Sequence, residues 1–168
     1  MLEYIKRSNY KLFLSIVFLA SFTNAQYLHV IGKDIFGNDG KKIILKGMGL
    51  GGWLVPEGYM LGTWGSPTSI RNRIVELIGE DSTKIFYEKF EKNYVAEEDI
   101  IQLAEWGFNS VRLPFHYKTL SPVYGSYDEK GFTVIDSVVA WCSRSNIYLI
   151  LDMHVAPGSQ SGDENADG

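Results

Sequence analysis

Apolar residues recur three and four positions apart over several stretches of the chain, which is the spacing of an amphipathic helix. The first such stretch follows Ser66-Pro67 and stops at Gly79. A serine before a proline is typical of a helix start, and a glycine of a helix end. We therefore predict a helix between these residues. Its apolar face consists of Ile70, Ile74, Leu77 and Ile78.

Three more helices are predicted further along the chain. The second has Asp81 as its N-terminal cap, and the third runs from about Glu97 to Trp106 and ends at Gly107. Acidic residues open the third helix, where the positive end of the helix dipole favours them. The apolar positions of the three helices are Ile85, Phe86 and Phe90; Ile100, Leu103 and Ala104; and Ile135, Val138, Val139 and Cys142.

Short strands are predicted near the start of the chain. Residues 28–35 and 42–46 flank the sequence Gly-Asn-Asp-Gly at 37–40, a strong turn signal, so we expect a β-hairpin. Residues 47–53 are too rich in glycine for a helix. We interpret them as a strand end that enters a loop, where the backbone closely approaches another group.

Two later strands alternate with the helices. Residues 109–114 form one, and residues 147–152 are almost continuously apolar, as expected of a parallel strand covered on both faces. This alternation indicates a parallel sheet with right-handed crossovers, in either an open doubly wound sheet or an eight-stranded barrel. A nucleotide site is disfavoured, because Trp53 and Pro56 stand where a phosphate-binding helix would begin.

The amino-acid composition excludes several classes of protein and leaves the predicted fold class unchanged. The chain is 45% hydrophobic and 21% charged, which excludes a disordered protein. Its 20 acidic residues outnumber its 16 basic ones, which argues against a nucleic-acid partner. The single cysteine, Cys142, excludes an internal disulfide and a thiolate-rich metal site, and its helical spacing predicts a buried thiol.

The N-terminus has the pattern of a secretory signal. Basic residues precede the apolar run 12–20, and small and polar residues follow as far as Ala25. The run is shorter than the roughly 20 residues of a transmembrane helix, and an uncleaved membrane anchor is the alternative. We predict a signal peptide of residues 1–25, a mature chain of residues 26–168 and a secreted protein without membrane association after cleavage.

In both architectures, functional side chains gather at the carboxyl ends of the strands. The candidates at the three ends are Trp53, Glu57 and Tyr59; Arg112, His116 and Tyr117; and Asp152 and His154. Asp152 and His154 share strand parity, so they can lie on one face. Arg112 needs a partner in its apolar strand, and a structural ion pair fits it as well as a functional role does.

Two further interpretations of the polar and aromatic residues stay open. A metal site is one, although the spacing of its donors matches no tight ligand motif. The donors are Asp152, His154, Asp163 and Glu164. A sugar-stacking cleft is the other, with core packing as the alternative for each ring. The rings are Trp53, Tyr59, Trp64 and Tyr117.

Three segments together resemble glycoside hydrolase family five, the cellulase-like (β/α)8 barrels. They are residues 46–59 (KGMGLGGWLVPEGY), 107–115 (GFNSVRLPF) and 151–160 (LDMHVAPGSQ). The third segment most resembles the exo-1,3-β-glucanase branch of the family. The resemblance implies an α/β fold, the N-terminal part of a (β/α)8 TIM barrel, with about three of the eight strands preceded by a β-hairpin.

The resemblance also implies roles for individual residues. Arg112 maps to an arginine that supports the nucleophilic carboxylate, and His154 to a histidine that contacts the sugar at the cleavage subsite. In the exo-glucanase branch, an acid and a tyrosine after the first strand hold the terminal glucose. These two residues map to Glu57 and Tyr59.

The tail departs from the pattern of that branch. Val155 replaces the usual glycine, and Ser161 replaces an asparagine. The acid–asparagine pair that follows the histidine loop maps loosely to Glu164 and Asn165. Ala96 stands where the branch often has a threonine helix cap, a loss that costs about 1 kcal/mol of local stability.

The implied reaction is retaining hydrolysis, in which one glutamate protonates the leaving oxygen and a second attacks the anomeric carbon. The two carboxyl groups stand roughly 5–5.5 Å apart. The resemblance places both on later strands, so no catalytic residue is expected within this chain. Since such a barrel needs about 250 residues, we expect residues 26–168 to be an incomplete catalytic domain, inactive on β-glucans and poorly soluble by itself.

The sequence thus predicts a secreted glycosidase that acts on a β-glucan or a related polysaccharide in polysaccharide catabolism, without a cofactor or metal. β-1,3-Glucan, β-1,4-glucan and mannan all fit. A non-catalytic carbohydrate-binding or vestigial barrel protein is one alternative, and a metal-dependent barrel hydrolase is another. Whether an Asn-Glu pair follows a further apolar strand would distinguish the enzyme from the non-catalytic protein.

Overall fold

The computed structural model describes residues 27–158 and Asp167 of the 168-residue chain. It divides the chain into two compact units, one up to Ile43 and one from Ile44 onward, and each is considered by itself. The predicted signal peptide, residues 1–25, lies outside the described residues and stays a prediction. In the described part, no helix is both long enough and apolar enough to cross a membrane.

The first unit holds a small antiparallel sheet in the order β1 (His29–Ile31), β2 (Asp34–Phe36) and β3 (Lys42–Ile43). The expected hairpin is confirmed between β2 and β3, where the Gly40 N–H donates to the Gly37 carbonyl at 3.0 Å.

The single strand expected over residues 28–35 is wrong, because it is divided between β1 and β2. Gly32 has a φ of 65°, and Ile31 pairs directly with Asp34 across the two residues between them. A glycine with positive φ at the first position of a two-residue turn folds the strand back on itself. The second strand is also shorter than expected, since it ends at Ile43 rather than Lys46.

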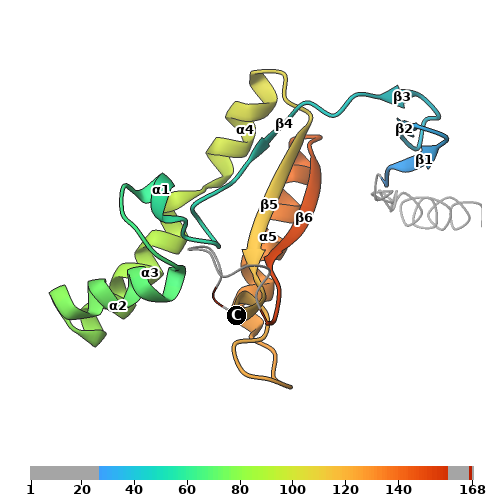
Figure 1. Cartoon of the computed structure of the whole chain (residues 1–168). Helices are drawn as coiled ribbons and strands as arrows, with labels where there is room; N and C mark the ends of the chain where they lie inside the picture. Colours follow the sequence, from blue (N-terminus) through green and yellow to red (C-terminus); the bar gives the residue numbers. More distant parts are fainter. Residues whose placement is uncertain (1–26, 159–166, 168) are drawn as a thin grey trace, which may run out of the picture. The chain divides into compact units, whose positions relative to one another are not determined.

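The second unit is built on a parallel sheet in the order β4 (Gly47–Gly49), β5 (Ser110–His116) and β6 (Tyr148–Val155). Gly49 pairs with Arg112, and Arg112 pairs with Ile150. Figure 1 shows β5 and β6 along each other with α5 (Glu129–Arg144) behind them. The expected parallel sheet is confirmed.

Of the remaining helices, the three longest are predicted from the apolar spacing, whereas the two short ones are not. These helices are α1 (Gly58–Leu61), α2 (Pro67–Ile78), α3 (Glu80–Tyr94), α4 (Glu97–Glu105) and the 3-10 helix η1 (Tyr117–Thr119). Part of the predicted apolar faces is exposed, including Leu77 and Ile85.

Ser66 caps α2 as predicted, with its hydroxyl accepting from the Ser69 N–H at 3.3 Å. Asp81 is not the cap of α3 but lies in its first turn. Gly79 ends α2 and is the N-cap of α3, so the second helix starts two residues earlier than expected.

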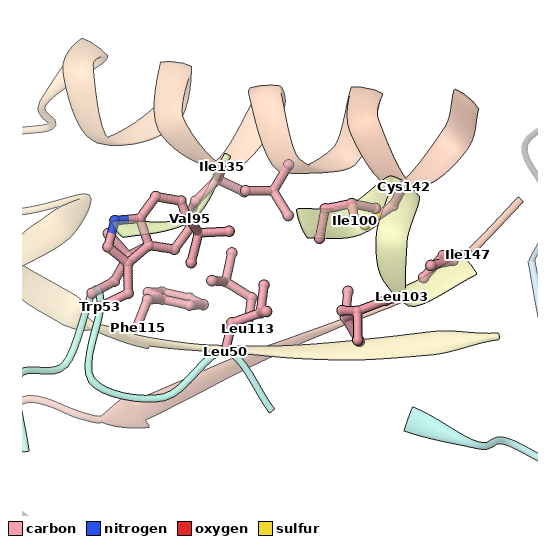
Figure 2. Packing of buried hydrophobic residues seen from close by; sticks show 13 residues of the cluster. Leu50, Trp53, Val95, Ile100, Leu103, Leu113, Phe115, Ile135, Cys142 and Ile147 are labelled. Carbon is pink, nitrogen blue, oxygen red and sulfur yellow. The ribbon is translucent and has the colours of Figure 1, made fainter. Parts of the chain in front are cut away.

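The core lies between the sheet and the helices on one side of it. Alternate residues of β5 point into this core, and they are Val111, Leu113 and Phe115. Figure 2 shows Leu113 and Phe115 meeting apolar side chains from the helices and loops; its other labelled residues are Leu50, Trp53, Val95, Ile100, Leu103, Ile135, Cys142 and Ile147. Cys142 is a core thiol as predicted, whereas Val139 is 45% exposed.

Asn109 fixes the start of β4 against the start of β5. Its side-chain Oδ1 accepts from the Lys46 N–H at 2.7 Å, and its Nδ2 donates to the Ile44 carbonyl at 2.9 Å. The amide of one residue thus replaces a pair of ladder hydrogen bonds, which sets the register that brings the two strand ends together.

The expectation that residues 147–152 are covered on both faces is wrong for the described chain. Three apolar residues of β6 stay exposed: Ile150 at 43%, Leu151 at 51% and Met153 at 45%. β6 is the last strand of its sheet, and in the described part no element lies beyond it. The apolar run therefore forms an open sheet edge.

Candidate functional site

Strand parity places three polar side chains on the face of the sheet that points away from the helices. Arg112 lies between the buried residues Val111 and Leu113, so its side chain points to the opposite face, where 45% of it is exposed. Asp152 and His154 lie two residues apart on the neighbouring strand, and Asp152 pairs with Pro114 in the ladder. The register thus places all three on one face, close enough for the long Arg112 side chain to reach the other two.

These three side chains form a compact cluster. The Arg112 guanidinium forms an ion pair with Asp152 through Nη2 and Oδ2. The Nδ1 atom of His154 lies 3.1 Å from the same carboxylate oxygen and 2.9 Å from Arg112 Nη2. Arg112 and His154, which were expected at separate strand ends of one site, are therefore in direct contact.

Asp152 was expected at the third strand end and as a candidate metal donor, but not as the partner of Arg112. Its parity with His154 was visible in the sequence, but its pairing with Arg112 depends on how two strands 40 residues apart are aligned. The ion pair supplies the partner that Arg112 needs. It does not decide between a structural and a functional arginine, because the guanidinium stays accessible.

Glu57 is the N-cap of α1 after the loop that follows β4, and Tyr59 lies in the first turn of that helix. Glu57 is 8% exposed, whereas Tyr59 is 71% exposed and its hydroxyl lies 3.4 Å from Glu57 Oε2. The negative charge of Glu57 and partial burial raise the pKa of Tyr59, and the positive charge of Arg112 opposes that rise. The charge of Arg112 therefore acts electrostatically on Tyr59.

Close packing of the glycine-rich segment positions Glu57. A Cβ atom added to Gly51 would lie 2.9 Å from Met60 Sδ and 3.5 Å from Glu57 Oε2. A Cβ atom at Gly52, whose φ is 74°, would lie 2.6 Å from the Tyr94 hydroxyl. The predicted close approach of this backbone to another group is confirmed, and α1 and α3 supply two of the groups.

The four aromatic residues of the expected cleft differ in exposure, and Tyr117 is half-buried, with its ring 4.8 Å from that of His116. Trp53 is 4% exposed, and its Nε1 donates to the Glu91 carbonyl at 2.9 Å, so it belongs to the core rather than to a sugar-stacking surface. Tyr59 and Trp64 are 71% and 73% exposed and remain accessible. Only the exposed rings can stack against a ligand.

His116 ends β5 in different surroundings from His154. It is 7% exposed, and its Nδ1 accepts from the Lys118 N–H at 3.1 Å. Burial and, after it, the charge of Lys118 lower its pKa. It lines a cavity of about 360 Å³. Arg71, Glu91 and Asp128 are among the other lining residues, whereas Glu57 and Arg112 are not.

Two of the predicted tail residues, Glu164 and Asn165, lie outside the described residues, as does the proposed metal donor Asp163. In residues 27–158 and at Asp167, no group of three histidine, cysteine, aspartate or glutamate side chains is placed to hold a metal ion. The described site is therefore the cluster of Arg112, Asp152 and His154 beside the Glu57–Tyr59 pair.

Comparisons with a family model and with individual known proteins agree on one family. A family model described as Cellulase (glycosyl hydrolase family 5) matches residues 73–167. A β-xylosidase of Phanerodontia chrysosporium is 34% identical over 143 residues, which is 84% of this chain and 30% of the relative. A probable glucan 1,3-β-glucosidase A of Emericella nidulans is 32% identical over 127 residues, 73% of this chain and 31% of the relative.

Other comparisons agree at the level of the fold. Endoglucanase C of Acetivibrio thermocellus is 40% identical over 77 residues, 45% of this chain and 22% of the relative. The crystal structure of a rutinosidase from Aspergillus niger matches with a TM-score of 0.56 and 21% identity, over 72% of this chain and 36% of that one. The chain thus spans about a third or less of the proteins that it matches.

Proposed function

Because the chain belongs to glycosyl hydrolase family 5, we propose that it supplies the sugar-binding ends of the first barrel strands to a glycosidase of β-glucans. The predicted α/β fold is confirmed: three parallel strands with helical crossovers, preceded by a hairpin, match a solved structure at a TM-score of 0.56. In a (β/α)8 barrel, chemistry is carried by the carboxyl ends of the strands. Asp152 and His154 lie in the carboxyl half of β6, and the Arg112 side chain reaches them from the third residue of β5.

One observation supports this proposal above the others. Polar side chains from two neighbouring strands lie together, with Arg112 bonded to Asp152 and His154. The charge of Arg112 also acts on Tyr59, which follows the first strand of this sheet. The cluster contains anionic, cationic and neutral hydrogen-bonding groups. Sugar hydroxyls both donate and accept, so a mixed set of this kind suits a glycosyl unit.

We assign each group a part in binding. The buried carboxylate of Glu57 accepts hydrogen bonds from hydroxyls of a terminal glucose, and the exposed Tyr59 ring lies against the same sugar. His154 contacts the sugar next to the scissile bond, and Arg112 supports the carboxylate that attacks it. Asn165 would add a further contact from the tail.

Hydrolysis itself is assigned to the whole protein. A retaining mechanism uses two carboxyl groups roughly 5–5.5 Å apart, one as acid and base and one as nucleophile. Of the described carboxylates at the site, Asp152 is already held by Arg112 and His154, and Glu57 lies against Tyr59. Both carboxylates are already engaged by neighbouring side chains, so we place the acid and base and the nucleophile on later strands of the barrel.

Sugar binding by the full 168-residue chain tests the proposal. Laminaribiose, cellobiose and xylobiose would each be titrated and followed by calorimetry, with Glu57→Gln as the site variant. Arg144→Ala is the matched control, since Arg144 pairs with Glu97 on the helical side. We expect a glucose disaccharide to bind and Glu57→Gln to abolish its binding. Equal loss in the Arg144→Ala variant, or binding of xylobiose alone, would contradict a glucan site.

The whole protein is also proposed to be secreted and to act on extracellular polysaccharide. The charged, apolar and small-residue order of residues 1–25 supports export. N-terminal sequencing of the protein recovered from culture medium should begin at Gln26. An N-terminus that retains the apolar run would support the uncleaved anchor instead.

A further inference from the structure

We propose that Asp152 is a positioning residue, which fixes the ring orientation and the tautomer of His154 by accepting a hydrogen bond from its Nδ1–H. The same carboxylate oxygen, Oδ2, also pairs with the Arg112 guanidinium. One oxygen would thereby hold both His154, which we assign to the sugar, and Arg112, which we assign to the attacking carboxylate. The value of this arrangement for catalysis rests on the proposed function, whereas the tautomer itself does not.

The donors and acceptors of the cluster leave two possible states of the ring. The Nδ1 atom lies 3.1 Å from Asp152 Oδ2 and 2.9 Å from Arg112 Nη2. A carboxylate only accepts and a guanidinium only donates. Nδ1 therefore either carries a proton and donates to Asp152, or is bare and accepts from Arg112. It cannot do both.

Charge favours the first state. A bond from Nδ1–H to a carboxylate is charge-assisted, and it leaves the Asp152–Arg112 ion pair undisturbed. In the second state, the bare nitrogen would lie 3.1 Å from an anionic oxygen with no proton between them. Asp152 is also the least exposed member of the cluster, at 29% against 37% for His154 and 45% for Arg112, so water weakens its bonds least.

The proposed state has a direct chemical consequence. With the proton on Nδ1, the Nε2 atom carries a lone pair and can accept a hydrogen bond from a sugar hydroxyl. Loss of Asp152 would free the ring to rotate and would let Arg112 draw the ring into the opposite tautomer. A carboxylate that orients a histidine through Nδ1 is a common device in sites that need one defined tautomer.

Nitrogen-15 spectra of the imidazole rings test this inference without any sugar or turnover. The chain has three histidines, His29, His116 and His154, so a His154→Gln variant assigns the signal. At a pH at which the ring is neutral, we expect His154 to carry its proton on Nδ1. In the Asp152→Asn variant, we expect the Nε2–H form to become the major one. A wild-type His154 with its proton on Nε2 would overturn the proposal.

Two further variants separate positioning from general damage. Arg112→Met removes the competing donor, and the Nδ1–H tautomer should persist in it. Loss of the Nδ1–H tautomer in this variant would show that Arg112 rather than Asp152 determines the tautomer of His154. Asp136→Asn changes an exposed acid on α5 and should leave the His154 signal unchanged. Since sugar binding is measured separately, failure of the glucan proposal and failure of this one give different results.

Discussion

At the scale of single residues, Arg112 connects the three strands of the site. Its carbonyl accepts from the Leu50 N–H at 2.9 Å, which ties it to the segment after β4. Its side chain reaches Asp152 and His154 on β6. A residue that is held at both its backbone and its side chain presents its charge in one place, which is what support of a developing transition state requires.

The Arg112→Ala variant of the active enzyme should therefore lose turnover more than substrate binding. Removal of one preorganised donor from an active site typically lowers kcat by about 10²-fold or more. We expect a fall of that order in kcat with a much smaller change in KM, measured on a soluble β-glucan. Arg144→Ala, which breaks a helix–helix ion pair, is the control. A rise in KM alone would make Arg112 a simple substrate contact.

Cys142 gives a residue-scale prediction about stability. Burial raises the pKa of its thiol from 9.0 to about 11. Between these two values, the unfolded chain ionises the thiol and the folded chain does not, so the free energy of unfolding falls as pH rises. Urea unfolding should show this decline between pH 9 and 11 and no such contribution below pH 9. The Cys142→Ala variant should lack the additional slope; identical slopes would contradict the assignment.

At the scale of elements, the start of α4 shows a cap that is half formed. The Asp99 carboxylate accepts from the Ala96 N–H at 2.8 Å, which is one bond of a capping box. The other bond needs a side-chain oxygen at position 96, and alanine has none. The helix nevertheless begins where the sequence predicts, because three acidic residues occupy its first turn.

Ala96→Thr should complete this cap and stabilise the protein by about 1 kcal/mol. The new hydroxyl would accept from the Asp99 N–H, which bonds at present to the Ala96 carbonyl at 3.2 Å. The gain is measured as the difference in free energy of unfolding from urea titrations. Ala96→Val has the same shape without the oxygen and is the matched control. An equal gain in both variants would mean that the branched side chain, not the hydrogen bond, stabilises the helix.

The helix ends could be predicted from the sequence because their signals are local. Ser66 caps α2, Gly79 ends it, and Gly107 follows α4 with a φ of 83°. The strand division at Gly32 could not be predicted in the same way, since it depends on pairing of β1 with β2. The four-residue α1 was missed because so short a helix contains no apolar repeat.

At the scale of the whole molecule, the location of the site could be predicted from the sequence, but the contacts between its side chains could not. Strand order placed Arg112 and His154 at neighbouring strand ends, and the structure brings them to 2.9 Å. The contact of Asp152 with Arg112 depends on strand register. The buried position of the Trp53 side chain depends on a hydrogen bond to the Glu91 carbonyl, 38 residues away. Long-range alignment of this kind leaves no periodic trace in a single sequence.

The open edge of β6 carries a whole-molecule prediction about solubility. An exposed apolar strand with unpaired backbone groups is a template for association with another chain. Leu151 is 51% exposed on this strand, so a lysine there should reduce self-association of the 168-residue chain without changing its circular dichroism. Leu77→Lys alters a leucine that is 81% exposed on α2 and is the matched control. Sedimentation velocity would show a smaller aggregated fraction for Leu151→Lys only. An equal reduction in both variants would mean that general charge, rather than the strand edge, governs association.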